Sequence, residues 1–136
     1  MDPIKLPPAA EDVRKEIKGI IPETSTSSHQ AAEIEPKIRK DGNKTYLGDW
    51  LANKISFLKK EMHIGDAIGD GWGWHLVYFS NSTELQNDRK QGFLVPLSEE
   101  ITLTPGGVLQ EGFYMNITTE PVVSSGATAI FIVPRN

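Results

Sequence analysis

Residues 100–118 read EITLTPGGVLQEGFYMNIT, and this stretch indicates the fold class. Apolar and polar residues alternate strictly in 101–104 and again in 113–117, which is typical of strands with one buried and one solvated face. Pro105, Gly106 and Gly107 lie between the two runs and favour a turn. The stretch therefore predicts strands at 100–104 and 112–118.

Outside this stretch, segments 72–80, 92–97 and 127–134 are also short and rich in β-branched and aromatic residues. Turn residues separate them, and no βαβ alternation is visible. We therefore expect a mainly β protein, a small antiparallel β-sandwich of the jelly-roll kind. The segment 127–134 is apolar on both faces, so it lies either at the centre of the sandwich or against a second subunit. We favour a subunit contact for part of it.

One amphipathic helix is expected immediately before the strands. Leu51, Ile55, Leu58 and Met62 recur at helical spacing within 47–62 and line one face. Asp49 suits the N-cap position. We expect this helix to pack on a sheet or on a neighbouring subunit, and we assign 47–136 to one domain of helix plus β-sandwich.

Residues 1–46 are expected to form a flexible, disordered N-terminal arm. They hold much of the proline, a Thr/Ser run at 24–28 and no aromatic residue before Tyr46, a composition that buries too little apolar surface to offset ordering. A short helix at 9–19 is indicated by the spacing of Val13 and Ile17. It is either a nascent helix of no consequence or a segment that folds on a partner.

Charge is distributed unevenly along the chain, whose formal net charge is −4. Residues 63–136 contain eight acidic and three basic residues, a net −5, which disfavours nucleic acid as a partner of this region. A local excess of positive charge precedes it and forms a basic patch, which is either a solvated surface, the default, or a contact for an anionic membrane face, nucleic acid or the acidic face of another copy. Its members are Lys37, Arg39, Lys40, Lys44, Lys54, Lys59 and Lys60.

The chain contains no cysteine, which excludes disulfides, thiol catalysis and thiolate metal sites. We expect no cofactor and no metal. Neither a signal-peptide pattern nor an apolar run long enough for a membrane span is visible in the sequence. We expect a soluble protein, cytoplasmic or virion-associated.

Two residue groups could carry chemistry or ligand binding. His63, Asp66, Asp70 and His75 have the right atoms for a metal or for acid–base work, but their spacing matches no ligand pattern, so we assign no catalytic residue. Trp72, Trp74 and Tyr78 would share one face of a strand; we favour a role in the core and a subunit interface, and the alternative is a platform on which flat rings stack on a sugar or other ligand.

We expect a non-enzymatic structural or assembly protein that self-associates through its β-sandwich, as a homo-oligomer, and contacts a subunit or protein partner through its arm. A virion component, such as a capsid, matrix or decoration protein, is the narrowest form of this expectation. The alternatives are a carbohydrate or small-ligand binding module using the aromatic face, and a small hydrolase using His75 with Asp66 or Asp70. Deleting residues 1–40 should leave the domain folded. The candidate interface residues are Val13, Ile17, Leu51, Ile55, Leu58, Ile130 and Ile132.

Overall fold

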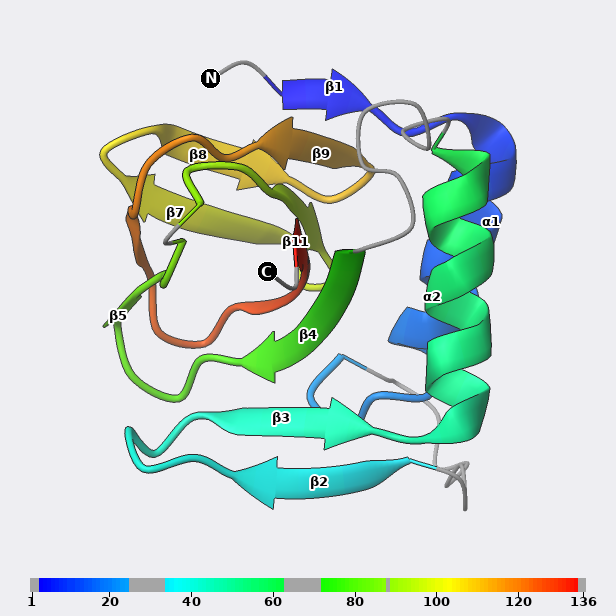
Figure 1. Cartoon of the computed structure of the whole chain (residues 1–136), viewed down its shortest axis with the longest axis horizontal. Coiled ribbons are helices and arrows are strands. Elements are labelled where there is room, and N and C mark those ends of the chain that lie inside the picture. The colour runs from blue at the N-terminus through cyan, green and yellow to red at the C-terminus, as the bar shows by residue number, and fades with distance from the viewer. Residues whose placement is uncertain (1–2, 25–33, 63–71, 88, 135–136) are drawn as a thin grey trace.

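The computed structural model describes residues 3–24, 34–62, 72–87 and 89–134. Two antiparallel β-sheets and two helices make up this part of the chain (Figure 1). The prediction of a mainly β, antiparallel sandwich is thereby confirmed. Three of the residues considered for acid–base chemistry, His63, Asp66 and Asp70, lie outside the described residues.

The larger sheet has seven strands in the order β1-β9-β6-β11-β4-β3-β2. Every neighbouring pair in it is antiparallel. The long strand β11 occupies the centre, between β6 and β4. In chain order the strands are β1 (Pro3–Lys5), β2 (Glu35–Ile38), β3 (Lys44–Leu47), β4 (Trp72–Tyr78), β6 (Phe93–Pro96), β9 (Phe113–Asn116) and β11 (Thr128–Pro134).

The smaller sheet has four strands in the order β5-β10-β7-β8. They are β5 (Thr83–Glu84), β7 (Glu100–Thr104), β8 (Gly107–Gln110) and β10 (Val122–Val123). The predicted turn after β7 forms at Pro105 and Gly106, with φ angles of 139° at Gly106 and 95° at Gly107 that favour glycine. All five strands expected from the sequence are present within a few residues of their predicted limits.

Two helices, α1 (Pro8–Lys18) and α2 (Asp49–Glu61), pack against each other along one side of the molecule (Figure 1). The helix expected at 47–62 is therefore confirmed as α2. Its N-cap is Gly48, so Asp49 lies one residue later than predicted, in the first turn. An acidic residue there still complements the positive end of the helix dipole.

Strand β11 is buried on both faces within this one chain. Ile130 and Ile132 belong to the apolar cluster that includes the buried faces of α1 and α2. Ala129 and Phe131 face the opposite way, into a second cluster shared with the four-stranded sheet. The structure thus differs from the favoured subunit contact: the protein has three layers, helices, large sheet and small sheet, so its own chain covers both faces of the strand.

The described residues of the expected flexible arm belong to the folded unit, which corrects that expectation for 3–24 and 34–46. Strand β1 pairs with β9, and the hairpin β2–β3 extends the large sheet. Ala10 and Ile17 of α1 are fully buried. The expectation of disorder used the average composition of residues 1–46, and that average does not reveal that the apolar residues of α1 lie on one face. Packing on α2 stabilises a helix that would be marginal alone.

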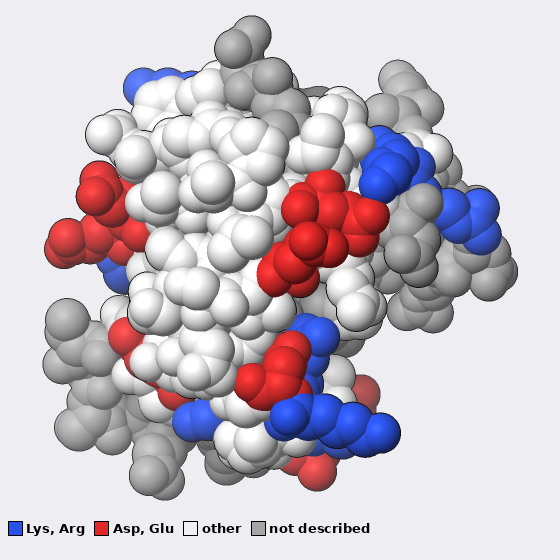
Figure 2. Space-filling view, turned by 90° about the vertical axis from the view of Figure 1, so that its left-hand side faces the viewer, with Lys and Arg blue, Asp and Glu red and all other residues white. Residues whose placement is uncertain are grey.

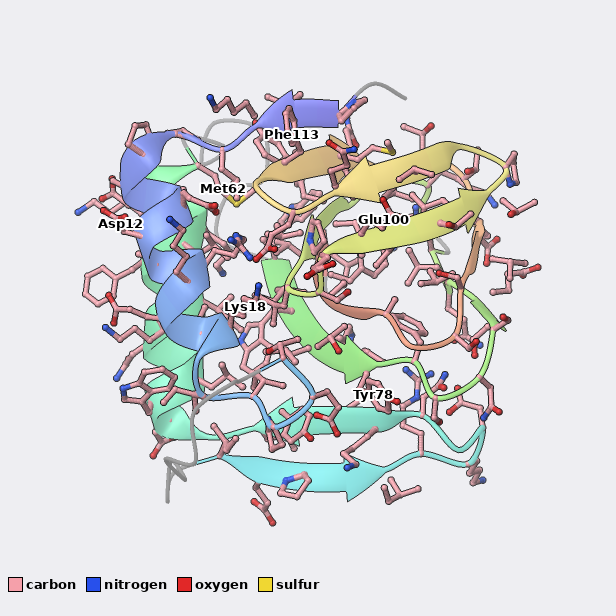
Figure 3. All side chains as sticks on the ribbon, turned by 180° about the vertical axis from the view of Figure 1, so that it is seen from behind. Asp12, Lys18, Met62, Tyr78, Glu100 and Phe113 are labelled. Atoms are coloured by element: carbon pink, nitrogen blue, oxygen red, sulfur yellow. The ribbon has the colours of Figure 1, made fainter. Side chains whose placement is uncertain are left out.

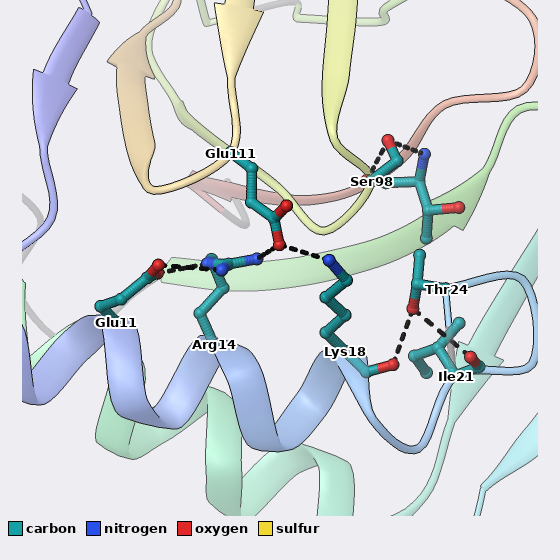
Figure 4. A network of polar contacts seen from close by, with 8 residues as sticks. Glu11, Arg14, Lys18, Ile21, Thr24, Ser98 and Glu111 are labelled. Atoms are coloured by element: carbon teal, nitrogen blue, oxygen red, sulfur yellow. Dashed lines mark hydrogen bonds and ion pairs between the residues drawn. The ribbon is translucent and has the colours of Figure 1, made fainter. Parts of the chain in front are cut away.

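A buried arginine links α1 to the loop between β8 and β9 (Figure 4). Arg14 is 1% exposed and donates from Nη1 to Glu111 at 2.8 Å. Its other donors bind Glu11, one turn earlier on the helix. Lys18 Nζ donates to the same oxygen of Glu111 at 2.6 Å. Figure 3 shows Lys18 on the side of α1 that faces the sheets, whereas Asp12 lies on the outer side.

Candidate functional site

The predicted interface residues are buried inside the protein. Ile17, Leu51, Ile55, Leu58, Ile130 and Ile132 are each 0% exposed, and Val13 packs against the same cluster. Helical and strand periodicity correctly marked these positions as apolar contacts. The contacts seen are intramolecular, because α1 and α2 cover the large sheet.

The aromatic strand face predicted on β4 exists, but it packs toward the helices. Trp72, Trp74 and Tyr78 are half-buried and lie against the apolar cluster under α1 and α2. The Trp72 ring lies 6.0 Å from the ring of Phe93, centroid to centroid. Their shared face is therefore confirmed. The rings contribute to the core, which limits the flat surface that a sugar could stack on.

His75 points the other way, to the face of β4 that is away from the helices, and is exposed. Among the described ranges, which leave out Asp66 and Asp70, no group of three or more His, Asp or Glu side chains could hold a metal ion. His75 instead lines a groove together with residues of several strands.

The predicted basic patch is divided between two parts of the fold. Lys44 pairs with Glu23 at 3.0 Å, and Lys54 pairs with Glu16 of α1 at 2.6 Å, so these two act within the protein. Lys59 and Lys60 lie at the C-terminal end of α2. The remaining members, Lys37, Arg39 and Lys40, lie on β2 and the turn after it.

The groove arises because the two sheets differ in width. The four-stranded sheet packs on β9, β6, β11 and β4 through the second apolar cluster, to which β2 and β3 contribute no residue. Figure 1 shows β2 and β3 at the opposite end of the molecule from β7 and β8. The face of the large sheet near β2 and β3 is therefore left uncovered, and a groove of about 600 Å³ lies there.

Cations from both walls line this groove. Lys37 and Arg39 come from β2 and its turn, and Arg89 comes from the segment after β5. Glu84 is the single carboxylate among the lining residues that the structure describes, which leave out Asp88. Arg39 reaches Asp41 at 3.3 Å, whereas neither Lys37 nor Arg89 takes part in an ion pair within the described part of the chain.

The floor of the groove is apolar. Val77, Phe79 and Phe131 line it and are only 3–4% exposed. Strand register explains the arrangement, since Lys37 is paired with Thr45 and Thr45 with Val77, which places all three on one face of the sheet. The groove thus combines a charged rim with an apolar base, a common pattern in binding sites.

A second surface lies on the outer face of the four-stranded sheet. Its centre carries Thr102, Thr104, Val108 and Val122, with Val108 and Val122 49% and 38% exposed. Register places Val108 opposite Thr102 and Val122 opposite Thr104. Figure 2 views the left-hand side of the molecule as drawn in Figure 1 and shows uncharged side chains over much of it, with acidic groups right of the middle and at the left edge.

Sequence reasoning found the two groove cations of β2 but missed Arg89 and the whole floor as parts of a site. Lys37 and Arg39 alternate with Ile38, a strand signal that could have placed both on one face. No pattern in the neighbouring sequence links Lys37 and Arg39 to Arg89, because the groove depends on how much of the large sheet the small sheet covers.

Neither described helix is long and apolar enough to cross a membrane. We compared the whole chain with models of protein families, with curated proteins and with solved structures, and no match was found in any of the three comparisons.

Proposed function

We propose that this protein is a non-enzymatic assembly protein that self-associates through the outer face of its four-stranded sheet. The observation that carries the proposal is the uncharged centre of that face, formed by Thr102, Thr104, Val108 and Val122. Charged residues are depleted at the centres of protein interfaces and are found at their rims. Here Glu84 and Glu100 lie at the ends of the same exposed face.

The edge strands of the two sheets also favour the small sheet as the site of self-association. An exposed edge presents unpaired backbone groups to other chains, and proline blocks such pairing. Both edge strands of the large sheet contain proline, at Pro3 in β1 and Pro36 in β2. The edge strands of the small sheet, β5 and β8, contain none. Proline therefore hinders strand pairing between copies at the large sheet, whereas no proline hinders it at β5 or β8.

The narrower proposal is a virion component, such as a capsid, matrix or decoration protein. It rests on the architecture alone, a compact β-sandwich that assembles, and therefore on analogy. The predicted role of the N-terminal arm in subunit contacts is replaced in this proposal by the small sheet, since the described arm residues are used inside the fold.

Light scattering of the full chain over a range of concentrations tests self-association. We expect a discrete oligomer, and we expect the double variant V108K/V122K to shift it toward monomer, because both changes add charge to the uncharged centre. The control is I38K/F57K, which adds the same charge at apolar residues that are 64% and 55% exposed elsewhere. A wild-type monomer at high concentration, or an equal shift in the control, would contradict the proposal.

A further inference from the structure

The charges of the groove near β2 and β3 indicate the kind of ligand that it accepts. Among the described lining residues, three cationic side chains, Lys37, Arg39 and Arg89, accompany one carboxylate, Glu84, in a protein whose net charge is −4. Lys37 and Arg89 are both exposed, and neither has an ion-pair partner among the described residues. A concentration of unneutralised positive charge in an acidic protein favours an anionic ligand.

The position of the cations favours an extended ligand over a compact one. Lys37 belongs to β2, whereas Arg89 lies on the wall formed by the segment after β5. The apolar residues Val77 and Phe131 lie in the floor of the same groove. A ligand with several carboxylates and apolar groups between them could use both walls and the floor.

The carboxamide of Asn87, another polar group that lines the groove, is occupied by the fold. The carboxamide nitrogen of Asn87 donates to the carbonyl oxygens of Ile117 and Thr119 at 2.9 and 3.0 Å, and its oxygen accepts from the backbone nitrogen of Gln91. Asn87 therefore stiffens the wall that carries Arg89. Lys37 and Arg89 have no ion-pair partner among the described residues and can bond an incoming carboxylate, whereas Arg39 also contacts Asp41.

The mode of binding follows from the edge of the sheet. Pro36 lies in β2, which forms the free edge beside the groove, so a partner cannot pair its backbone along the whole of that strand. Contacts must then come mainly from side chains entering the groove. In an extended peptide successive side chains point to opposite sides, so alternating acidic and apolar residues would match rim and floor. A volume of about 600 Å³ lies within the range typical of ligand pockets.

We propose that this groove binds an extended acidic segment of a partner protein, with its carboxylates on Lys37, Arg39 and Arg89 and its apolar side chains over Val77 and Phe131. Glu84 borders both surfaces, but the cations of the groove and the uncharged centre of the assembly surface are different residues, so the two proposals can be tested separately.

Fluorescence anisotropy of a short labelled peptide of alternating glutamate and leucine, titrated with the full-length protein, tests the proposal. We expect saturable binding that weakens as salt is added, because exposed charges are screened. The double variant K37E/R89E should weaken it about tenfold, from two lost charge pairs and the repulsion that replaces them. The control K40E/K60E makes the same change of net charge at exposed lysines outside the groove.

Three results would overturn the proposal: an equal loss in K40E/K60E, equally tight binding of a glutamine–leucine peptide, or displacement of the peptide by inorganic phosphate at a similar concentration. Thermal melts of both double variants establish that they are folded. The oligomeric state of K37E/R89E, measured by light scattering, should equal that of the wild type, which separates failure of this inference from failure of the assembly proposal.

Discussion

Replacement of Arg14 by alanine should cause a large loss of stability. The guanidinium is 1% exposed and bonds two carboxylates, Glu11 on its own helix and Glu111 on the loop between β8 and β9 (Figure 4). The R14A variant removes the buried cation and leaves Glu111 with Lys18 as its cationic partner in this network. It also removes the aliphatic part of the side chain from the core.

The expected magnitude follows from the burial of each partner. Removing one member of a buried ion pair costs about 3–5 kcal/mol. Glu11 and Glu111 are 25% and 23% exposed, so water can partly rehydrate them, and the lower end of that range applies. A loss of about 3 kcal/mol is a large part of a typical stability of about 5–15 kcal/mol. It corresponds to a fall in Tm of roughly 10 °C for a domain of this size.

Urea unfolding followed by tryptophan fluorescence measures this loss. The matched control is K15A, an exposed neighbour on the same helix, which should change stability by less than about 0.5 kcal/mol. The R14M variant keeps the apolar stem, so its difference from R14A separates packing from charge. A loss below about 1 kcal/mol in R14A would refute the reasoning, since removal of a buried and bonded cation should lower the free energy of unfolding by more than that.

The same network makes stability depend on pH. Burial acts to raise the pKa of Glu111, but hydrogen bonds from Lys18 and Arg14 and their positive charges outweigh it, so the pKa lies below its ordinary value. A carboxyl whose pKa is lowered by folding stabilises the protein above its unfolded pKa, and this contribution is lost as the pH falls through the folded pKa. We expect E111Q to flatten the acid limb of the stability–pH curve. An unchanged limb would show that other groups control it.

Three further changes test the packing. G92A would place a methyl group 2.5 Å from the Phe131 ring, so we expect a loss of about 1–3 kcal/mol in urea unfolding, and an unchanged midpoint would contradict the close approach. I132A should cost about 2–5 kcal/mol by leaving a cavity, because Ile132 is 0% exposed; a smaller loss would mean that the site collapses. Deleting residues 1–24 should abolish the cooperative calorimetric melt by uncovering α2 and the large sheet; a surviving transition would show that α1 is dispensable.

This last expectation reverses the one drawn from the sequence for a deletion of residues 1–40. Composition indicated too little apolar surface for order, and for an isolated segment that argument holds. In the fold, Ile17 and Ile21 meet the buried face of α2 and are 0% exposed. A segment of average polarity is ordered when its few apolar residues lie on one face and a partner helix is present.

Local periodicity was sufficient for the strands 72–80, 92–97, 100–104, 112–118 and 127–134 and for the helix at 47–62. The alternation of apolar residues, and the turn residues between the runs, are properties of short segments. They predict strands and helices because the backbone geometry of each element places residues on one face at a fixed spacing. The same information identified which faces are apolar, including both faces of 127–134.

Only the tertiary structure decided what covers those faces. The sequence pattern of β11 is equally compatible with a second subunit and with the helices and small sheet that lie there. The ion pair of Arg14 with Glu111 joins residues 97 positions apart. The groove brings Lys37 of β2 and Arg89 together where the small sheet does not cover the large one. Periodicity specifies the face on which a side chain lies. The partner of that face depends on the packing of distant segments, which the sequence of one element does not contain.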